Sequence, residues 1–284
     1  MRDLTEKNVT EAVLASLGRC EDRRLRQVTE SLVRHLHAFL REVEPTPDEW
    51  LAGIRFLTET GQRCDENRQE FILLSDTLGA TILMDAINNR KPAGATESSV
   101  LGPFYREGAP ARADGADLTA GSGPSVRVSG RVVDLERRPV PGAILDVWQT
   151  APSGLYHMQD PSVPEFDLCG RFQGDDQGRF AFRTRKPVSY PIPVDGPAGR
   201  LLRQLGRPIH RPAHMHFIVS APGHVPVVTQ LFTEGDACLD SDPVFGVKES
   251  LVVRYLEDGK GPDGSPRFRL EHDFVLERQK PPAR

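Results

Sequence analysis

The chain has 284 residues, and its formal net charge of −4 comes from 36 basic and 40 acidic side chains. A chain of this length can bury a substantial apolar core without disulfides or structural metals. No block of basic residues stands out, which argues against nucleic acid or an anionic membrane surface as a partner. A small or neutral partner fits this composition better.

The four cysteines lie far apart in the sequence, with no CxxC pair among them. This spacing disfavours both a zinc ribbon and a disulfide framework, so we expect reduced thiols in a cytoplasmic protein. The charged N-terminus, Met1 to Lys7, lacks the apolar segment of a secretion signal. No apolar window reaches the length of a membrane span, so we expect no integral membrane contact. The cysteines are Cys20, Cys64, Cys169 and Cys238.

Residues 5 to about 90 have the periodicity of helices. Apolar residues between Leu25 and Leu40 recur at spacings of three and four, which predicts a buried helix face. The segment Thr46-Pro47-Asp48-Glu49 combines a capping hydroxyl, a proline at the first helical position and a glutamate three residues later. A new helix is therefore predicted to begin near Pro47. A third run, roughly Glu66 to Asn88, keeps the same spacing, and Gly79 weakens that pattern only slightly.

From Lys91 onward, glycine, proline, serine and aspartate punctuate short β-branched and aromatic runs. We therefore expect an α+β protein, with a helical N-terminal dimerisation domain at 1–98 and a β-sandwich catalytic domain at 99–284. The predicted strands are Val126–Val133, Ala143–Gln149, Arg179–Arg183, Met215–Ser220, Val227–Phe232, Ser250–Tyr255 and Phe268–Leu276.

Two histidines open one of these predicted strands. His214 and His216 are two residues apart, which places both on one face of a strand. Two such imidazoles can chelate iron, copper, zinc or nickel, although a strand-edge histidine can also bond only to backbone or water. His35 and His37 have the same spacing in a helical pattern, where their side chains point in different directions, and they are expected to be surface or packing residues.

Two of the four tyrosines, Tyr156 and Tyr190, lie in turn-rich segments that follow predicted strands. Either tyrosine alone could cap a sheet edge with its hydroxyl bonded to backbone. A phenolate is also a hard anionic oxygen ligand, and two of them stabilise Fe(III) over Fe(II). The positions of the two tyrosines alone are therefore compatible with either role.

Four segments together resemble the intradiol dioxygenases, the family of catechol, chlorocatechol and hydroxyquinol 1,2-dioxygenases. The resemblance spans nearly the whole chain and implies one Fe(III) per subunit, held by Tyr156, Tyr190, His214 and His216. It also implies that Tyr190 is the labile ligand and a base for substrate protons. The four segments are Gly154-Leu155-Tyr156, Tyr190-Pro191-Ile192-Pro193, Arg211-Pro212-Ala213-His214-Met215-His216-Phe217 and Thr229-Gln230.

The same resemblance implies roles for two further polar residues. Arg211 would stabilise negative charge that develops on the substrate ring, with a surface ion pair as the alternative. Gln230 would form hydrogen bonds near the iron, with plain sheet packing as the alternative.

The expected substrate pocket resembles that of the hydroxyquinol branch of the family. Asp76 could accept a hydrogen bond from the third hydroxyl of benzene-1,2,4-triol, or it could cap or pair within the helical domain, and these two interpretations weigh evenly. The expected product is 3-hydroxy-cis,cis-muconate or maleylacetate, whereas catechol or chlorocatechol would give cis,cis-muconates. The pocket residues are Leu73, Asp76, Val100, Leu101, Gly102, Pro103, Phe104, Ile192, Pro193, Arg211 and Val244.

One segment departs from the family pattern, and two rival function classes remain. Cys169 stands where the family commonly has an arginine, in the segment Phe166-Asp167-Leu168-Cys169-Gly170. A non-catalytic β-sandwich binding module or a zinc hydrolase would both be colourless, whereas tyrosinate bound to Fe(III) should make the protein red to burgundy. The helical region is expected to form a homodimer interface, with lipid held between its helices.

Overall fold

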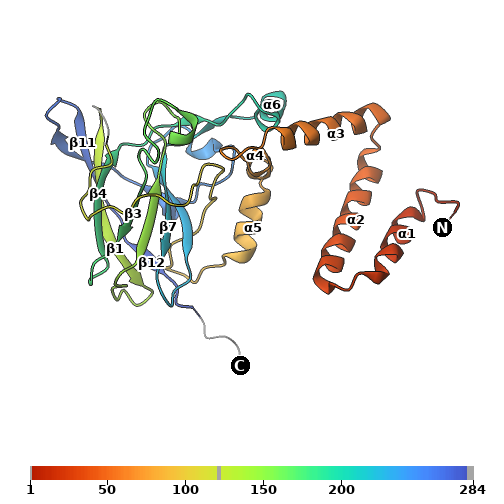
Figure 1. Cartoon of the computed structure of the whole chain (residues 1–284), viewed down its shortest axis with the longest axis horizontal. Helices are drawn as coiled ribbons and strands as arrows, with labels where there is room; N and C mark the ends of the chain where they lie inside the picture. Colours follow the sequence, from red (N-terminus) through yellow and green to blue (C-terminus); the bar gives the residue numbers. More distant parts are fainter. Residues whose placement is uncertain (1, 120–122, 280–284) are drawn as a thin grey trace. The chain divides into compact units, whose positions relative to one another are not determined.

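The computed structural model describes residues 2–119 and 123–279. The chain divides into two compact units, Met1–Thr58 and Glu59–Arg284. Helices come first and two face-to-face sheets follow in the second unit, so the predicted α+β class is confirmed (Figure 1). The boundary predicted between residues 98 and 99 stays a prediction.

The first unit is helical, and its elements begin at recognisable caps. Asp22 accepts hydrogen bonds from the backbone of Arg24 and Leu25 at the start of helix α2 (Arg23–Val43). Thr46 and Glu49 form the predicted capping box, so a helix does begin at Pro47. Helices α1 and α2 lie side by side (Figure 1). The helical elements are α1 (Val9–Ser16), η1 (Leu17–Arg19), α2 (Arg23–Val43) and α3 (Pro47–Gln62), which runs into the second unit.

The apolar face predicted on α2 exists, but the prediction that it is buried is wrong for the single chain. Leu25, Val28, Leu32, Leu36 and Phe39 are between 47% and 62% exposed. These apolar side chains are therefore left in contact with water in the single chain. Among the described residues, no helix is both long and apolar enough to cross a membrane.

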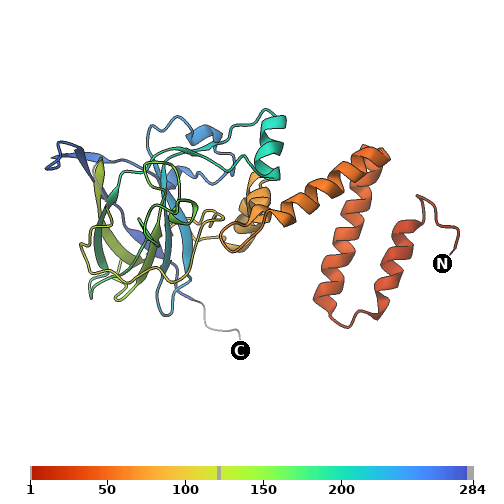
Figure 2. The same cartoon turned by 45° about the horizontal axis from the view of Figure 1, so that its top comes forward.

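The helices of the second unit differ from the prediction at one glycine. The run predicted as one helix is two helices, α4 (Glu70–Thr77) and α5 (Ala80–Asn88). Gly79 separates them with a backbone φ of 72°, a left-handed conformation that interrupts an α-helix. A further helix, α6 (Pro197–Gln204), lies next to α4 (Figure 2). The Glu70 carboxylate joins them by accepting a hydrogen bond from the Ala198 N–H at 3.0 Å.

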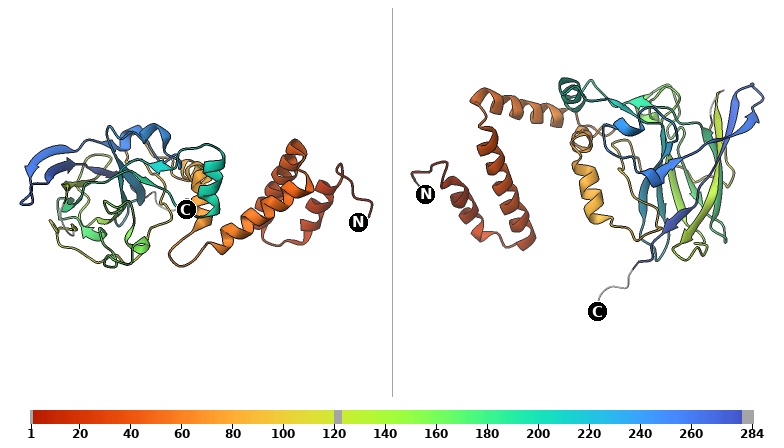
Figure 3. Two further views of the ribbon diagram at one scale, coloured as in Figure 1. Left: turned by 90° about the horizontal axis from the view of Figure 1, so that it is seen from above. Right: turned by 180° about the vertical axis from the view of Figure 1, so that it is seen from behind.

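The first sheet is organised around its longest strand, β1 (Ser125–Asp134). It pairs antiparallel with β4 (Arg179–Arg185) on one side and parallel with β11 (Pro266–Glu271) and β12 (Phe274–Leu276) on the other. The strand predicted over Phe268–Leu276 is therefore two strands. The strand is interrupted at His272, whose N–H donates to Ser129 O. Strand β10 (Leu256–Lys260) pairs with β11, and this hairpin extends from the sandwich (Figure 3).

The second sheet carries the two predicted histidines on its central strand. Its strand order is β3-β2-β7-β8-β9, and β7 lies between β2 and β8. Only Val252–Val253 of the run predicted at Ser250–Tyr255 is a strand. A separate two-stranded ladder joins β5 (Tyr190–Pro191) to β6 (His210–Arg211). The strands of the large sheet are β2 (Ile144–Trp148), β3 (Gly170–Gln173), β7 (His214–Ser220), β8 (Val227–Thr233) and β9 (Val252–Val253), and the short 3₁₀ helices are η2 (His157–Gln159), η3 (Leu239–Ser241) and η4 (Glu249–Leu251).

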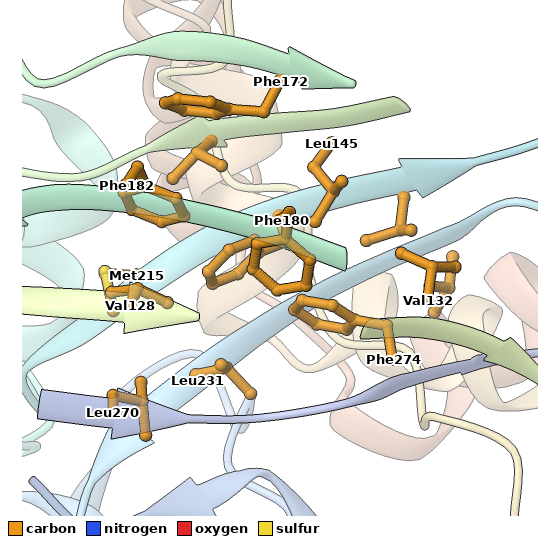
Figure 4. Packing of buried hydrophobic residues seen from close by; sticks show 14 of the residues in the cluster. Val128, Val132, Leu145, Phe172, Phe180, Phe182, Met215, Leu231, Leu270 and Phe274 are labelled. Carbon is orange, nitrogen blue, oxygen red and sulfur yellow. The ribbon is translucent and has the colours of Figure 1, made fainter. Parts of the chain in front are cut away.

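The core fills the space between the two sheets. Its buried side chains alternate along the strands, as period-two patterning requires. Phe182 of β4 stacks on Phe172 of β3 with ring centroids 4.8 Å apart, which joins the two sheets directly. Figure 4 shows this packing, with Val128, Val132, Phe180, Leu270 and Phe274 from the first sheet and Leu145, Met215 and Leu231 from the second.

Candidate active site

Four side chains converge at one end of the second sheet. The hydroxyl oxygens of Tyr156 and Tyr190 are 2.8 Å apart, and Tyr156 Oη is 2.8 Å from His216 Nε2. His214 Nε2 lies 3.1 Å from His216 Nε2 and 3.5 Å from Tyr190 Oη. All four residues are at most 4% exposed. The structure thus brings together, within one small volume, the four residues that the sequence singles out.

Local structure explains how each tyrosine reaches this point. Tyr156 follows a turn at Gly154, whose φ is 81°, and Gln159 Oε1 accepts the Tyr156 N–H at 3.0 Å. Tyr190 is in β5 and pairs there with Arg211 of β6. A Cβ at position 154 would lie 3.0 Å from Tyr190 Cβ, so glycine permits the close approach of the two segments.

The histidines are oriented by different contacts. His214 Nδ1–H donates to Pro212 O at 2.7 Å, which leaves Nε2 with a lone pair facing the cluster. His216 stacks on Trp148, with ring centroids 4.6 Å apart and an interplanar angle of 12°. His216 Nδ1 has no hydrogen-bond partner within the described part of the chain. Stacking on Trp148 and the contact of Nε2 with Tyr156 Oη therefore orient this ring.

Burial controls the protonation of all four groups. It lowers the pKa of His214 to about 3, assisted by the charge of Arg211, and it lowers the pKa of His216 well below its ordinary value. Burial also raises the pKa of both phenols. Neutral imidazoles carry the lone pairs that metal binding requires, but two neighbouring phenols would ionise only beside a strong positive charge.

This set of ligand atoms fits a ferric ion. Two imidazole nitrogens and two phenol oxygens face one another without a counter-charge large enough to ionise the phenols. A trivalent cation would supply that charge, and hard oxygen ligands would in turn favour the ferric state. The residues present therefore agree with the iron that the family resemblance implies.

Arg211 lies beside the cluster in a buried network. Its Nη1 lies 3.0 Å from His214 Nε2, and its Nη2 donates to Gln230 Oε1 at 2.7 Å. Gln230 Nε2 donates in turn to Val100 O at 2.6 Å. Asp242 accepts from Arg211 through both carboxylate oxygens. The surface ion pair considered for Arg211 is excluded, because its side chain is 4% exposed.

A narrow cavity opens next to the four side chains. Most residues of the predicted substrate pocket line it, together with three of the four predicted metal ligands. Val100 and Leu101 do not line it: Val100 is buried and binds Gln230 through its carbonyl, and Leu101 packs against the aromatic cluster of the site. The lining residues are Leu73, Asp76, Gly102, Pro103, Phe104, Tyr156, Tyr190, Ile192, Pro193, Arg211, His216 and Val244.

Asp76 is the carboxylate in this wall. It is 1% exposed, and its Oδ1 has no hydrogen-bond partner among the described residues. Burial raises its pKa to about 6, although Thr81 and Arg211 oppose that shift. A buried, half-satisfied acid is costly unless a ligand completes its hydrogen bonds.

Cys169 occupies an apolar position instead of the expected arginine. It is buried with Phe104, Trp148, Tyr156 and Tyr190, and its thiol donates to Asp167 O at 3.3 Å. Burial raises the pKa of this thiol to about 12, so it stays neutral at physiological pH. It contributes packing around Tyr156 without charge. All four cysteines are free.

Sequence reasoning missed three residues at this site. Trp148 stacks on His216, Asp242 holds Arg211, and Asp236 binds the segments that lead to Tyr190 and His214. Asp236 and Asp242 lie in loops after β8, where no periodic pattern indicates which direction a side chain points. Trp148 at the end of a predicted strand was the one detectable signal, since its register partner is His216.

Comparisons with known proteins agree with this geometry. The Dioxygenase family model matches residues 100–278, and the model for the catechol dioxygenase N terminus matches 22–96. The chain is 46% identical to a hydroxyquinol 1,2-dioxygenase of Rhizobium sp. (strain MTP-10005), over 96% of both chains. It is 47% identical to a 6-chlorohydroxyquinol 1,2-dioxygenase of Cupriavidus pinatubonensis, over 97% of this chain and 99% of the relative.

A solved structure shows the same fold over nearly the full length. The hydroxyquinol 1,2-dioxygenase from Pseudomonas putida DLL-E4 superposes with a TM-score of 0.88 at 48% identity. The match covers 96% of this chain and 99% of that one. Neither rival class, the binding module or the zinc hydrolase, is supported by these relatives. The chain belongs to the intradiol ring-cleavage dioxygenase family.

Proposed function

We propose that this chain cleaves hydroxyquinol, benzene-1,2,4-triol, between its two adjacent hydroxylated carbons with O2. The product would be 3-hydroxy-cis,cis-muconate or its tautomer maleylacetate, in the degradation of aromatic compounds. The observation that carries the proposal is the cavity, which is lined by three residues of the four-residue cluster and by the buried carboxyl group of Asp76. Relatives of similar length that are named for hydroxyquinol and its chlorinated form support the same substrate.

The proposed cofactor is one Fe(III) per chain, held by Tyr156, Tyr190, His214 and His216. A ferric ion held there would supply the Lewis acidity that binds the diol and activates the ring toward O2. The neutral imidazoles provide lone pairs, and the phenolates offset the charge of the ion. The mutual distances of 2.8–3.5 Å between neighbouring ligand atoms support binding of one ion by all four residues.

Tyr190 is proposed as the base that accepts a proton from the substrate. Tyr156 Oη has two partners at 2.8 Å, whereas Tyr190 Oη has one such partner and a longer contact to His214. The charge of Arg211 also favours the phenolate form of Tyr190, against the dominant effect of burial. The less tightly held phenolate is the better candidate to take up a proton at Oη.

Arg211 is proposed to stabilise negative charge on the ring. Its Nε and Nη2 are occupied by Asp242 and Gln230, so the remaining nitrogen, Nη1, is the one directed to the cluster. A guanidinium fixed in this way needs little reorganisation when charge develops beside it.

Asp76 is proposed to select the third hydroxyl of the substrate. The surrounding wall is formed by apolar side chains such as Leu73, Ile192 and Val244. A hydroxyl that donates to Asp76 Oδ1 would satisfy the unpartnered oxygen, which catechol could not do. Catechol or chlorocatechol remains the second candidate, because the rest of the wall is apolar and suits an unsubstituted ring.

The exposed apolar face of α2 supports the proposal of a homodimer. Leu25, Leu32 and Phe39 repeat along one face and are at least half exposed. A second copy of this helix would remove that surface from water, and lipid held between the helices would fill remaining gaps. Such a dimer in the cytoplasm, with hydroxyquinol and O2 as its small-molecule partners, is the assembly we propose.

The ratio of kcat/KM for hydroxyquinol to that for catechol tests the substrate assignment. We expect a ratio of roughly 10² or more in favour of hydroxyquinol, since a site built for a hydrogen bond rejects an analogue that lacks it. Preference for catechol would contradict the substrate assignment while leaving the family assignment intact.

A further inference from the structure

One carboxylate outside the cavity binds the two segments that lead to Tyr190 and His214. Asp236 lies in the turn after β8, and its Oδ2 accepts from Ser189 Oγ at 2.5 Å and from the Ala213 N–H at 3.0 Å. Ser189 directly precedes Tyr190, and Ala213 directly precedes His214. A single oxygen atom therefore joins the chain at both positions.

The contacts hold the two segments to different degrees. The Ala213 peptide is fixed on both sides, because its N–H binds Asp236 and its carbonyl accepts from the Thr233 N–H at 2.9 Å. Ser189 is linked to Asp236 by its side-chain hydroxyl. Ala213, before His214, is thus held through two backbone hydrogen bonds, whereas Asp236 reaches the Tyr190 segment through one side-chain hydroxyl.

Asp236 is itself held in place by its own turn. Its second oxygen, Oδ1, accepts from the Cys238 N–H at 2.8 Å. The side chain is partly buried, and all of its described partners belong to the second unit. Both oxygens are therefore used, one for the turn and one for the two segments of the site.

We propose that Asp236 is a positioning residue that sets the separation between Tyr190 Oη and His214 Nε2. This inference rests on the proposed iron site. If the carboxylate is removed, the two segments can separate, and the cluster loses its fit to one ion although no ligand has changed. Loss of a hydrogen bond that orients a metal ligand commonly lowers metal affinity by about 10- to 100-fold.

The test uses the full chain loaded with iron, as wild type and as Asp236→Ala, Asp236→Asn and Ser189→Ala. Asp175→Ala is the control, because Asp175 also accepts from backbone N–H groups of a turn, those of Gln177 and Arg179, but binds neither segment that leads to a proposed ligand. The measurements are iron retained against a chelator, the visible absorption of the resting protein, and the melting temperature after iron removal.

We expect Asp236→Ala to lose iron roughly 10- to 100-fold more readily than wild type and to shift the visible band. Asp236→Asn should lie between them, since its amide oxygen can replace only one of the two carboxylate oxygens, and the NH2 group that replaces the other cannot accept a hydrogen bond. Ser189→Ala should shift the band with little loss of iron, because the Ala213 contact persists. Asp175→Ala should lower the melting temperature without changing iron retention or the visible band.

The inference is overturned if Asp236→Ala retains iron and its absorption band as Asp175→Ala does. Should the alanine variant not fold, Asp236→Asn and Ser189→Ala decide the question, and wild-type iron retention and spectra in both would also overturn it. Failure of the wild-type chain to bind iron would instead contradict the proposed function.

Discussion

Arg211 and Asp242 form a two-point ion pair with almost no access to solvent. Arg211 Nε lies 3.0 Å from Asp242 Oδ1, and Nη2 lies 3.2 Å from Oδ2. The Gly246 N–H donates to the same Oδ2 at 3.0 Å, so the loop that contributes Val244 to the cavity wall also holds the carboxylate. The orientation of the guanidinium thus depends on a residue that touches neither the cavity nor the four proposed ligands.

Replacement of Asp242 by asparagine should reduce turnover more than stability alone explains. We expect kcat to fall roughly 10- to 100-fold, because Arg211 would no longer be fixed toward the cluster. Asp134→Asn is the control, since Asp134 is also buried and pairs with Arg138 and Arg278 at the end of β1. Steady-state kinetics and thermal melts of both variants check this. Equal losses of kcat in the two variants would contradict the proposed role.

Tyr190→Phe should abolish turnover with little loss of stability. The ring and its packing remain, but one ligand and the proposed base are removed, and we expect kcat to fall at least about 10³-fold. Tyr255→Phe is the control, because the hydroxyl of Tyr255 is also buried but has no hydrogen-bond partner among the described residues. Near-normal turnover in Tyr190→Phe would refute the assignment of Tyr190.

Gly154→Ala tests the close approach of the two tyrosine segments. The new Cβ would lie 3.0 Å from Tyr190 Cβ in addition to the strain of a positive φ. Gly223→Ala has similar backbone strain, with a φ of 71°, but no atom within 4 Å of the new Cβ. Both variants should lose about 1 kcal/mol of stability from backbone strain, and only Gly154→Ala should change the visible spectrum of the iron-loaded protein. Identical spectra for both variants would count against this packing argument.

Asp76 should make stability depend on pH in the iron-free protein. Its folded pKa of about 6 is above the ordinary value, so the folded state binds the proton more tightly than the unfolded chain does. The contribution of the protonated Asp76 to the free energy of unfolding is therefore complete below about pH 4 and is lost as the pH rises through about 6. The difference in unfolding free energy between wild type and Asp76→Asn should therefore fall by on the order of 2 kcal/mol over this range. A difference that does not change with pH would contradict the raised pKa.

The sequence predicted local features well where periodicity carries the information. The strand with His214 and His216 was predicted because β-branched and aromatic residues continue after them, and the capping box placed the start of α3 at Pro47. The prediction was wrong at Gly79, where a single left-handed residue divides a pattern that looks continuous. Helical spacing also cannot distinguish a face buried within the chain from one left for a partner, which is why the α2 face was predicted as buried.

The long-range contacts of the site could not be predicted from pattern alone. Asp242 is 31 residues from Arg211, and Asp236 is 47 residues from Ser189. Nothing in the turn composition of these loops distinguishes an aspartate that caps its own turn from one that holds a distant segment. The grouping of the tyrosines with the histidines came from the family resemblance, and the fold brings the four together.

Anomalous diffraction at the iron absorption edge, from crystals of the iron-loaded chain, tests the central claim most directly. We predict one iron peak per chain, within bonding distance of Tyr156 Oη, Tyr190 Oη, His214 Nε2 and His216 Nε2. A peak bound elsewhere, or a fully active crystalline protein without iron at these four atoms, would contradict the account.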